Sequence, residues 1–391
     1  MHRRNFIRTA AITAASYSRI FGANNRLGMA LIGGGRRGRE VMMALLGTKS
    51  VDLVSVCDIY DNHRALAAQA LGKPGHECAA HEESLARRDV DAVLVATADH
   101  WHRDIALDSI KAHKHLYLEK PIVHHFEETN SLYRAAKLSD KVVFVGTQQR
   151  SGAHYQQAKE EIFDRNRLGK VLLVRASWSD FGWQARNVRN EPKPPGLDWV
   201  RFLGRTPYHD YEKARYDSWR IYPEYGGGVL ADILNHWADV AQWMMSDSVP
   251  LDAVTSGGIY LAKDGRTNPD TVNAILRYSK GWNLAFESTI WPVENPRPSV
   301  EFLGTEGTLD IARSDYVFRP SKGQPVQVKA SGGLEAAHAA NFVAACLTGS
   351  KPSADITIGV EGLLPCHLAR AAYWSGRRAV YHADRNEIST S

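Results

Sequence analysis

Cysteines and long apolar runs are scarce in this 391-residue sequence. The four cysteines stand far apart, without a CxxC pair or a zinc-like spacing, and we expect buried thiols. His-x-His pairs occur, but no carboxylate or cysteine stands at a matching spacing, so no metal site is expected. The Lys and Arg residues behind the net charge of +5 are scattered, and no basic run follows the first ten residues. This distribution argues against a nucleic-acid partner.

The composition is that of a globular protein with more than one core. Hydrophobic residues make up 44% and charged residues 23% of the chain, which is typical of folded domains. A chain of 391 residues exceeds the usual size of one hydrophobic core, which predicts two domains. Tryptophan is abundant, and seven of the ten lie at positions 178, 183, 199, 219, 237, 243 and 282. Such rings either stack on sugar faces or fill a core, and composition leaves both roles open.

The N-terminus has the order of features of an export signal. An Arg-Arg pair at positions 3 and 4 is followed by a Phe-Ile pair and a short alanine-rich stretch, which resembles a twin-arginine signal peptide. The apolar stretch is too short to span a bilayer, so no membrane anchor is expected. We therefore expect residues 1–25 to be a signal, cleaved between Ala15 and Asn25, and the protein to be exported folded to the periplasm. The alternative is a frayed basic terminus on a cytoplasmic protein.

A glycine motif follows the first predicted strand. Residues 28–35 form a short apolar run that leads into Gly33-x-Gly35-x-x-Gly38 and a helix-like segment. In this arrangement the glycines allow a tight turn, close approach of the backbone to a pyrophosphate, and close helix–strand packing. The motif predicts a dinucleotide site, with contacts from Gly33, Gly35, Gly38 and two loop arginines, Arg36 and Arg37.

The second predicted strand, residues 51–61, contains an acidic residue at the position that reads the ribose. Asp58 lies twenty residues after Gly38. A carboxylate there accepts hydrogen bonds from both ribose hydroxyls and repels a 2′-phosphate. NAD is therefore the expected cofactor rather than NADP, although phosphate contacts from the loop arginines would soften this preference.

Strands and helices then alternate as in a doubly wound fold. Strands are predicted at 90–97, 115–121 and 141–147, and helices at 61–71, 103–114 and 126–139. This alternation predicts a parallel sheet with helices on both faces. Ligands bind at the carboxyl ends of such strands. The residues expected at those ends, and hence at the cofactor, are Thr97, His102, Glu119, Lys120 and Gln148.

The remaining sequence predicts a second α/β domain. A strand at 170–180 precedes a long loop-rich region, of a kind that usually packs over a site. A helix at 229–245, strands at 250–261, 271–278, 282–290 and 299–303, and helices at 335–348 and 358–375 follow. The meander predicts a large, mostly antiparallel open sheet. We divide the chain into the signal at 1–25, an NAD-binding Rossmann domain at 26–147, and a substrate and oligomerisation domain at 148–391. Its C-terminal helices are expected to pack back on the first domain.

Several motifs together resemble the Gfo/Idh/MocA oxidoreductase family. They are LIGGGRRG at 31–38, ATADHWH at 96–102, LEKP at 118–121, VGTQQR at 145–150, WR at 219–220 and GGGVLADILNHWAD at 226–239. They are ordered and spaced as in that family, over nearly the whole chain that follows the signal. The resemblance implies hydride transfer between NAD(P) and a hydroxyl-bearing carbon of a sugar or polyol, and oligomers formed through the C-terminal sheet. It also implies that Lys120, Asp232 and His236 lie beside nicotinamide and substrate, and that Trp219 and Arg220 touch the cofactor.

The chemistry of alcohol oxidation requires the same residue types. A base must remove the hydroxyl proton as hydride leaves, and a histidine with an unshifted pKa suits this role at His236. A neighbouring Lys120 ammonium would stabilise the developing alkoxide. Asp232, one helical turn before the histidine, would orient the imidazole or bind a sugar hydroxyl. Asp239, on the same stripe of the helix, is expected to be an accessory or solvated acid, with substrate contact left open.

The expected function is oxidation of a secondary hydroxyl of a sugar, polyol or sugar derivative. Because free NAD is scarce outside the cytoplasm, an exported enzyme is expected to hold its cofactor tightly and regenerate it within each cycle. One alternative is an NAD-dependent glycoside hydrolase that oxidises transiently, eliminates the aglycone, adds water and reduces again. A second is a non-catalytic, nucleotide-bound sugar sensor. The sequence leaves the particular sugar open.

Overall fold

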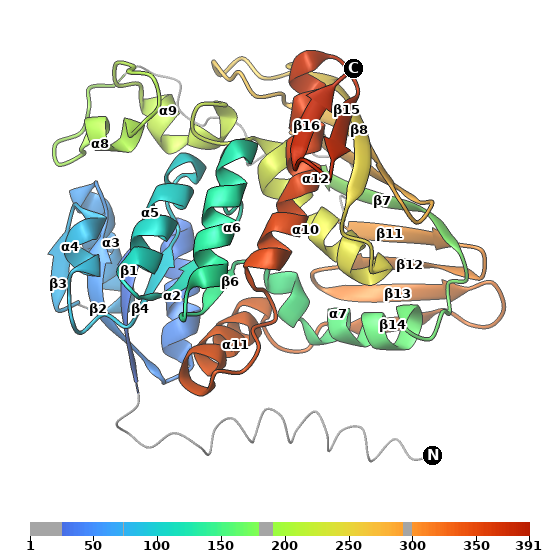
Figure 1. Cartoon of the computed structure of the whole chain (residues 1–391), viewed down its shortest axis with the longest axis horizontal. Coiled ribbons are helices and arrows are strands. Elements are labelled where there is room, and N and C mark those ends of the chain that lie inside the picture. Colours follow the sequence, from blue (N-terminus) through green and yellow to red (C-terminus); the bar gives the residue numbers. More distant parts are fainter. Residues whose placement is uncertain (1–25, 73, 180–190, 292–298) are drawn as a thin grey trace.

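The computed structural model describes residues 26–72, 74–179, 191–291 and 299–391, and it contains two β-sheets with helices packed around and between them (Figure 1). The predicted export signal and Trp183 lie outside the described residues. Within these ranges, no helix is long and apolar enough to cross a membrane. No group of three or more His, Cys, Asp or Glu side chains in the same ranges is placed to hold a metal ion.

The first sheet is parallel, as predicted, with the order β3-β2-β1-β4-β5-β6. Its strands are β1 (Leu27–Ile32), β2 (Val51–Cys57), β3 (His76–Cys78), β4 (Ala92–Val95), β5 (His115–Leu118) and β6 (Val143–Val145). Every residue of β1 and β4 is buried, as expected for strands covered on both faces. The strand order reverses at β1, so the crevice between the ends of β1 and β4 is where a ligand is expected.

Helices cover both faces of this sheet. They are α2 (Arg36–Gly47), α3 (Asp61–Leu71), α4 (His81–Leu85), α5 (Asp99–Lys111), the short η1 (Phe126–Glu128) and α6 (Thr129–Leu138). The predicted elements exist in the predicted order, but several bounds differ. The strand expected at 90–97 ends at Val95, and the helix expected from 103 begins at Asp99. The short β3 and α4 were not predicted.

The second sheet has ten strands in the order β14-β13-β12-β11-β7-β10-β9-β8-β15-β16. They are β7 (Val171–Ser179), β8 (Pro250–Gly258), β9 (Thr271–Tyr278), β10 (Asn283–Thr289), β11 (Ser299–Gly304), β12 (Gly307–Ala312), β13 (Asp315–Pro320), β14 (Val326–Lys329), β15 (Ala379–His382) and β16 (Glu387–Thr390). All neighbours pair antiparallel except β7 and β10. The predicted open, mostly antiparallel sheet is confirmed. The meander expected to end at 303 continues through β12, β13 and β14, and β15 and β16 extend the other edge.

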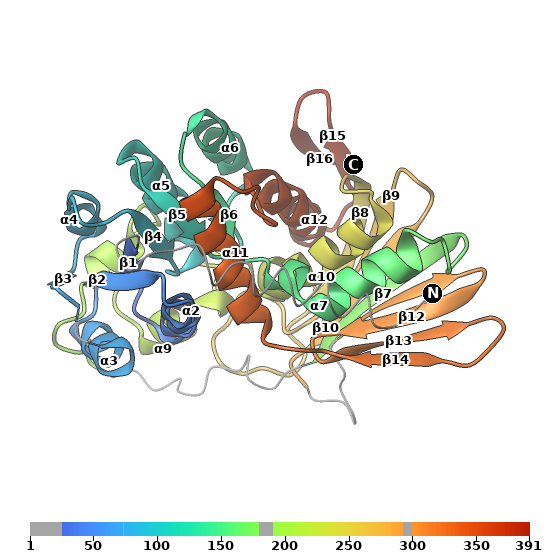
Figure 2. The same ribbon diagram turned by 90° about the horizontal axis from the view of Figure 1, so that it is seen from below.

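Helices pack on one face of the second sheet and join it to the first (Figure 2). They are η2 (Gln148–Ser151), α7 (Ala153–Ala158), η3 (Lys159–Phe163), α10 (Val229–Met245), α11 (Leu334–Thr348) and α12 (Ile356–Ser375). The helix predicted at 229–245 has the bounds of α10, and fourteen of its residues are buried. It packs against α12 and against β7, β10 and β11 of the sheet. Helix α11 packs back against α2 of the first sheet, which agrees with the expectation for the C-terminal helices.

The loop-rich segment returns to the first sheet. Residues 196–225, called the strap below, contain α8 (Trp199–Leu203), α9 (Lys213–Asp217) and η5 (Trp219–Ile221). The strap bonds to the loop that follows β2 and to the first turn of α5: Asp198 N–H donates to Ile59 O at 3.0 Å, and His100 Nε2 bonds to Phe202 O at 2.7 Å. A separate apolar cluster, which includes Trp199, Phe202 and Tyr225, fixes the strap there.

The face of the second sheet that points away from α10 carries exposed apolar side chains. Leu172 on β7, Val254 on β8 and Ile275 on β9 are each more than a third exposed. Such a face is typical of a protein–protein contact. Homo-oligomerisation through this sheet stays a prediction.

Candidate active site

The glycine motif forms an open cradle at the end of β1. Gly33 has a φ of +98°, which favours glycine. A Cβ on Gly38 would lie 2.0 Å from the carbonyl oxygen of Gly33, so only glycine lets α2 approach the strand this closely. A Cβ on Gly35, the residue before α2, would meet no atom within 4 Å. The free space above Gly35, beside the first amides of α2, fits a pyrophosphate.

Asp58 supports this cradle and faces the same cavity. It follows the last residue of β2, and its carboxylate accepts the amides of Gly34 at 2.7 Å and Tyr60 at 2.9 Å. His63 Nδ1 lies 3.3 Å from Asp58 Oδ2. Since a carboxylate oxygen accepts two hydrogen bonds, capacity remains on the cavity side for a ribose diol. The residues present fit the cofactor predicted from the sequence.

We expect Asp58→Asn to weaken discrimination against NADP roughly tenfold, because the amide no longer repels a 2′-phosphate. The amide oxygen can still accept the Gly34 amide, so the cradle should persist. The measurement is the ratio of dissociation constants for the two nucleotides. Asp52→Asn, at an exposed ion pair with Arg26, is the control, and an unchanged ratio in Asp58→Asn would contradict the assignment.

A single cavity of about 800 Å³ runs from this cradle to α10 and the second sheet. It is in the size range of ligand sites. It is lined by all of the predicted site residues except Gly38, which packs under the cradle. The lining predicted from the sequence comprises Gly33, Gly35, Arg36, Arg37, Asp58, Thr97, His102, Glu119, Lys120, Gln148, Trp219, Arg220, Asp232 and His236.

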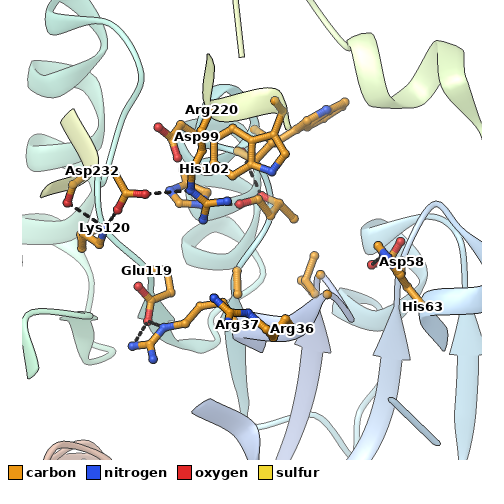
Figure 3. A pocket seen from close by; sticks show the side chains of 18 of the residues that line it. Arg36, Arg37, Asp58, His63, Asp99, His102, Glu119, Lys120, Arg220 and Asp232 are labelled. Carbon is orange, nitrogen blue, oxygen red and sulfur yellow. Dashed lines mark hydrogen bonds and ion pairs between the residues drawn. The ribbon is translucent and has the colours of Figure 1, made fainter. Parts of the chain in front are cut away.

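Lys120, Asp232 and Arg220 form an ion-paired cluster in this cavity (Figure 3). Lys120 Nζ donates to the Asp232 carboxylate, in short contact, and to its backbone carbonyl at 3.0 Å. Arg220 Nε donates to the other carboxylate oxygen at 2.7 Å. Two cations therefore share one carboxylate, and the Lys120 and Asp232 side chains are only 9% and 14% exposed. Lys120 also precedes a cis peptide bond to Pro121.

Burial changes the pKa values of Lys120 and His236 from those expected from the sequence. Desolvation lowers the pKa of Lys120 to about 7, while the contact with Asp232 favours the ammonium. Desolvation and the charges of Lys120, Arg313 and Arg37 hold the pKa of His236 well below its usual range. The unshifted histidine expected at this site is therefore wrong, because the imidazole is buried among cations.

A hydrogen bond to Gln149 nevertheless fixes the orientation of the His236 ring. Its Nδ1 donates to Gln149 Oε1 at 3.2 Å, which leaves Nε2 as a hydrogen-bond acceptor. Nε2 has no bonded partner in the part of the chain that the structure describes. A neutral imidazole with a free acceptor at the cavity can hold a substrate hydroxyl.

Other predicted residues have supporting contacts. His102 faces two carbonyls, those of Pro121 at 2.6 Å and Thr97 at 3.1 Å. The guanidinium of Arg220 stacks on Trp219, 4.1 Å from the ring centroid.

Two other predicted site residues lack such contacts. Gln148 Oε1 is buried without a partner among the described residues. Arg36 is the first residue of α2 rather than a loop residue, and its side chain is 88% exposed.

Arg37 differs from the expectation of a phosphate ligand. It also lies in the first turn of α2, and its guanidinium binds Glu119 at 2.8 Å and Glu335 of α11 at 2.9 Å. This triad ties the first sheet to α11. Because its guanidinium is already bonded to two carboxylates, Arg37 holds Glu119 at the cavity wall.

Asp239 was expected to be accessory or solvated, which is wrong. Its carboxylate is buried and binds Arg150 at 2.8 and 3.0 Å. Asp239 does not line the cavity. The pair joins α10 to η2, so Asp239 is structural.

Sequence reasoning missed several residues of the cavity wall. Asp99, in the first turn of α5, is buried, and burial raises its pKa. Arg313 after β12 and Tyr216 of the strap also face the cavity. Trp178 on β7 lines it too, and it is one of the tryptophans for which the sequence left sugar stacking open. Asp99 stands in a motif that was recognised, and Tyr216 lies in the loop-rich region that was expected to pack over a site. Arg313 follows a strand, β12, that was not predicted.

Comparison with known proteins agrees with this geometry. Residues 27–147 match the model of an oxidoreductase family with an NAD-binding Rossmann fold, and residues 155–310 match the GFO/IDH/MocA C-terminal domain. The chain is 27% identical to 1,5-anhydro-D-fructose reductase of Ensifer adhaerens, over 76% of this chain and 78% of that one. It is 22% identical to myo-inositol 2-dehydrogenase of Thermotoga maritima, but the match spans only about half of that relative (56% of each chain).

Solved structures share the fold. The WlbA dehydrogenase from Bordetella pertussis, determined with NADH and UDP-GlcNAcA, aligns with a TM-score of 0.71 at 19% identity. The alignment covers 92% of this chain and 100% of that one. The two-sheet architecture is therefore that of known dehydrogenases.

Proposed function

The chain belongs to the GFO/IDH/MocA oxidoreductase family, and on that premise we propose that it oxidises a secondary hydroxyl of a sugar, polyol or sugar derivative with an NAD that stays bound between turnovers. The main support is that one cavity joins the nucleotide cradle to Lys120, Asp232 and His236. The relatives named as sugar and inositol enzymes act on the same class of molecule.

Lys120 is the group best suited to accept the hydroxyl proton. If His236 accepted it beside a charged Lys120, two cations would stand together in a desolvated site. If neutral Lys120 accepts it, the new ammonium is already paired with Asp232. A pKa near neutrality is also the optimum for a general base at physiological pH. Lys120 is therefore the proton acceptor in this proposal, and His236 binds and orients the diol.

The electron balance of the step is simple. A bound NAD would supply the hydride acceptor, so that the carbinol carbon loses two electrons as a hydride and becomes a ketone. The hydroxyl proton moves to Lys120 Nζ, while Asp232 stabilises the resulting ammonium. Reduction returns the proton by the reverse path.

The strap supports retention of the nucleotide. Tyr216 stacks on His63 with centroids 6.1 Å apart, and its hydroxyl lies 3.4 Å from His63 Nδ1, beside Asp58. The strap thus closes over the end of the cavity where the ribose would lie. Release of a nucleotide from this position would require the strap to open, so slow exchange is expected.

We expect purified protein to contain bound NAD, identified by mass spectrometry after denaturation. Tyr216→Ala should release it roughly tenfold faster, since an aromatic contact at the centre of an interface contributes more than about 1 kcal/mol. Tyr208→Ala is the matched control, because Tyr208 lies in the strap but is 74% exposed. Equal release from both variants and the unchanged protein would argue against a closing role of the strap.

Export in the folded state is part of the proposal. Retention of NAD would let a protein work where free nucleotide is scarce, and the Arg-Arg pair at the N-terminus is consistent with a route that carries folded proteins. The test is cell fractionation of the full chain and of a variant with Lys at both positions. Equal periplasmic amounts of both would contradict the twin-arginine route.

The deciding experiment is a screen of sugars, polyols and glycosides with the purified protein. Sugar-dependent formation of NADH, or of a reduced second substrate, supports the proposed function. Release of aglycone without net NADH would replace it with glycoside cleavage through transient oxidation. Sugar binding with neither product would leave a nucleotide-bound sensor.

A further inference from the structure

Arg313 lies at the turn between β12 and β13 and faces the same cavity as Lys120 and His236. Its guanidinium stands over two indole rings, 5.6 Å from the centroid of Trp178 and 5.9 Å from that of Trp237. Trp237 is fully buried. Cation–π contacts of this kind hold a guanidinium in place while leaving its N–H groups available.

Arg313 has no carboxylate partner in the part of the chain that the structure describes. The other cavity cations do: Lys120 and Arg220 share Asp232. Glu335 is the carboxylate whose charge acts on Arg313, but Arg37 binds both of its oxygens, at 2.9 and 3.1 Å. The Arg313 side chain is exposed at the cavity rather than buried in the core, although partial desolvation still lowers its pKa. Arg313 therefore presents to the cavity a positive charge that no carboxylate of the described residues pairs with.

The position of Arg313 assigns this charge to the substrate end. It projects from the second sheet beside Trp178 and acts electrostatically on His236. The ribose end of the cavity lies at Asp58, next to β2. In the first sheet, β2 and β4 lie on opposite sides of β1. An anionic group on the substrate could meet Arg313 while a ring hydroxyl faces Lys120.

On the basis of the proposed function, we propose that Arg313 binds a carboxylate of the substrate, so that the sugar oxidised is a uronic acid or another sugar acid. The planar guanidinium matches a carboxylate with two parallel hydrogen bonds. A phosphate dianion fits less well, because Lys120 and Arg220 are already bonded to Asp232 and Arg313 supplies only one charge. The flanking indoles add apolar surface for the sugar ring.

The test compares matched sugar pairs with the NAD-loaded protein. D-Glucuronate is paired with D-glucose, D-galacturonate with D-galactose, and glucose 6-phosphate is the phosphate arm. Binding is followed by calorimetry and hydride transfer by NADH absorbance. We expect a preference of at least about tenfold for the uronates, the effect of one charge-assisted hydrogen-bonded pair.

The variants are Arg313→Gln and, as control, Arg319→Gln. Arg319 is an exposed residue of β13 that does not line the cavity. Arg313→Gln should weaken uronate binding and kcat/KM roughly 10- to 100-fold, with the neutral sugars unchanged within about threefold. Arg319→Gln should change neither.

The outcomes separate this inference from the proposed function. A preference for the neutral sugar or the phosphate ester, an equal loss for both members of a pair, or loss of bound nucleotide in Arg313→Gln would overturn the inference. Failure of every sugar to transfer hydride would overturn the proposed function. Arg313-dependent binding of uronate would still stand in that case and would support an acid-sugar site.

Discussion

Lys120→Arg is expected to reduce the rate of hydride transfer by roughly 10³-fold while the purified protein keeps its NAD. Arginine preserves the positive charge beside Asp232 but stays protonated, so it cannot accept the hydroxyl proton. Lys120→Ala, which also removes the cation, should lower the rate by roughly 10³- to 10⁴-fold. The measurement is single-turnover formation of NADH with a saturating substrate.

The pH dependence separates proton transfer from charge stabilisation. In the unchanged protein the rate of oxidation should rise as the pH passes the pKa of Lys120, which burial lowers to about 7. Below that pKa the ammonium predominates and cannot accept a proton. The rise should be absent from Lys120→Arg. Lys111→Arg, at the exposed end of α5, is the control, and near-normal turnover in Lys120→Arg would show that the charge alone suffices.

The second large effect is expected for Asp232→Asn. Its carboxylate is shared by Lys120 and Arg220, so the amide leaves two cations close together with no neutralising charge. We expect a loss of roughly 10²- to 10³-fold in hydride transfer, comparable to removal of one strong electrostatic contact in an active site. Without the carboxylate the ammonium is less stable, the pKa of Lys120 falls, and the rise in the pH profile should move to lower pH.

Asp239→Asn, two helical turns further along α10, is the matched control. It breaks a buried ion pair with Arg150 outside the cavity. Stability should fall by up to about 3 kcal/mol, because Arg150 loses its counter-charge, while the pH profile stays unchanged. A shifted profile in Asp239→Asn, or an unshifted one in Asp232→Asn, would contradict the assignment.

The parts predicted from the sequence depend on local patterns. The glycine motif, the acid after the second strand and the alternation of strands and helices are set by residues close together in the chain. They predicted the parallel sheet, the cradle and the position of Asp58. The bounds of α10 also follow from local signals, a glycine run before it and an apolar sequence within it.

The parts that were not predicted depend on contacts between distant segments. Asp239 meets Arg150 and Arg37 meets Glu335 only when η2 and α11 pack in place. The low pKa of His236 arises from burial between elements, which residue type alone does not reveal. Strands β12 and β13 did carry a signal, since Leu309, Ile311, Tyr316 and Phe318 alternate with less buried residues. Recognising it would have placed Arg313 at a turn.

The most direct test of the central claim is NADH formation after rapid mixing of the NAD-loaded protein with sugars, sugar acids and polyols across a range of pH. The account predicts about one NADH per site with at least one of them, at a rate that rises through the pKa of Lys120 and is lost in Lys120→Arg. Sugar binding to the loaded protein without any hydride transfer at any pH would contradict it.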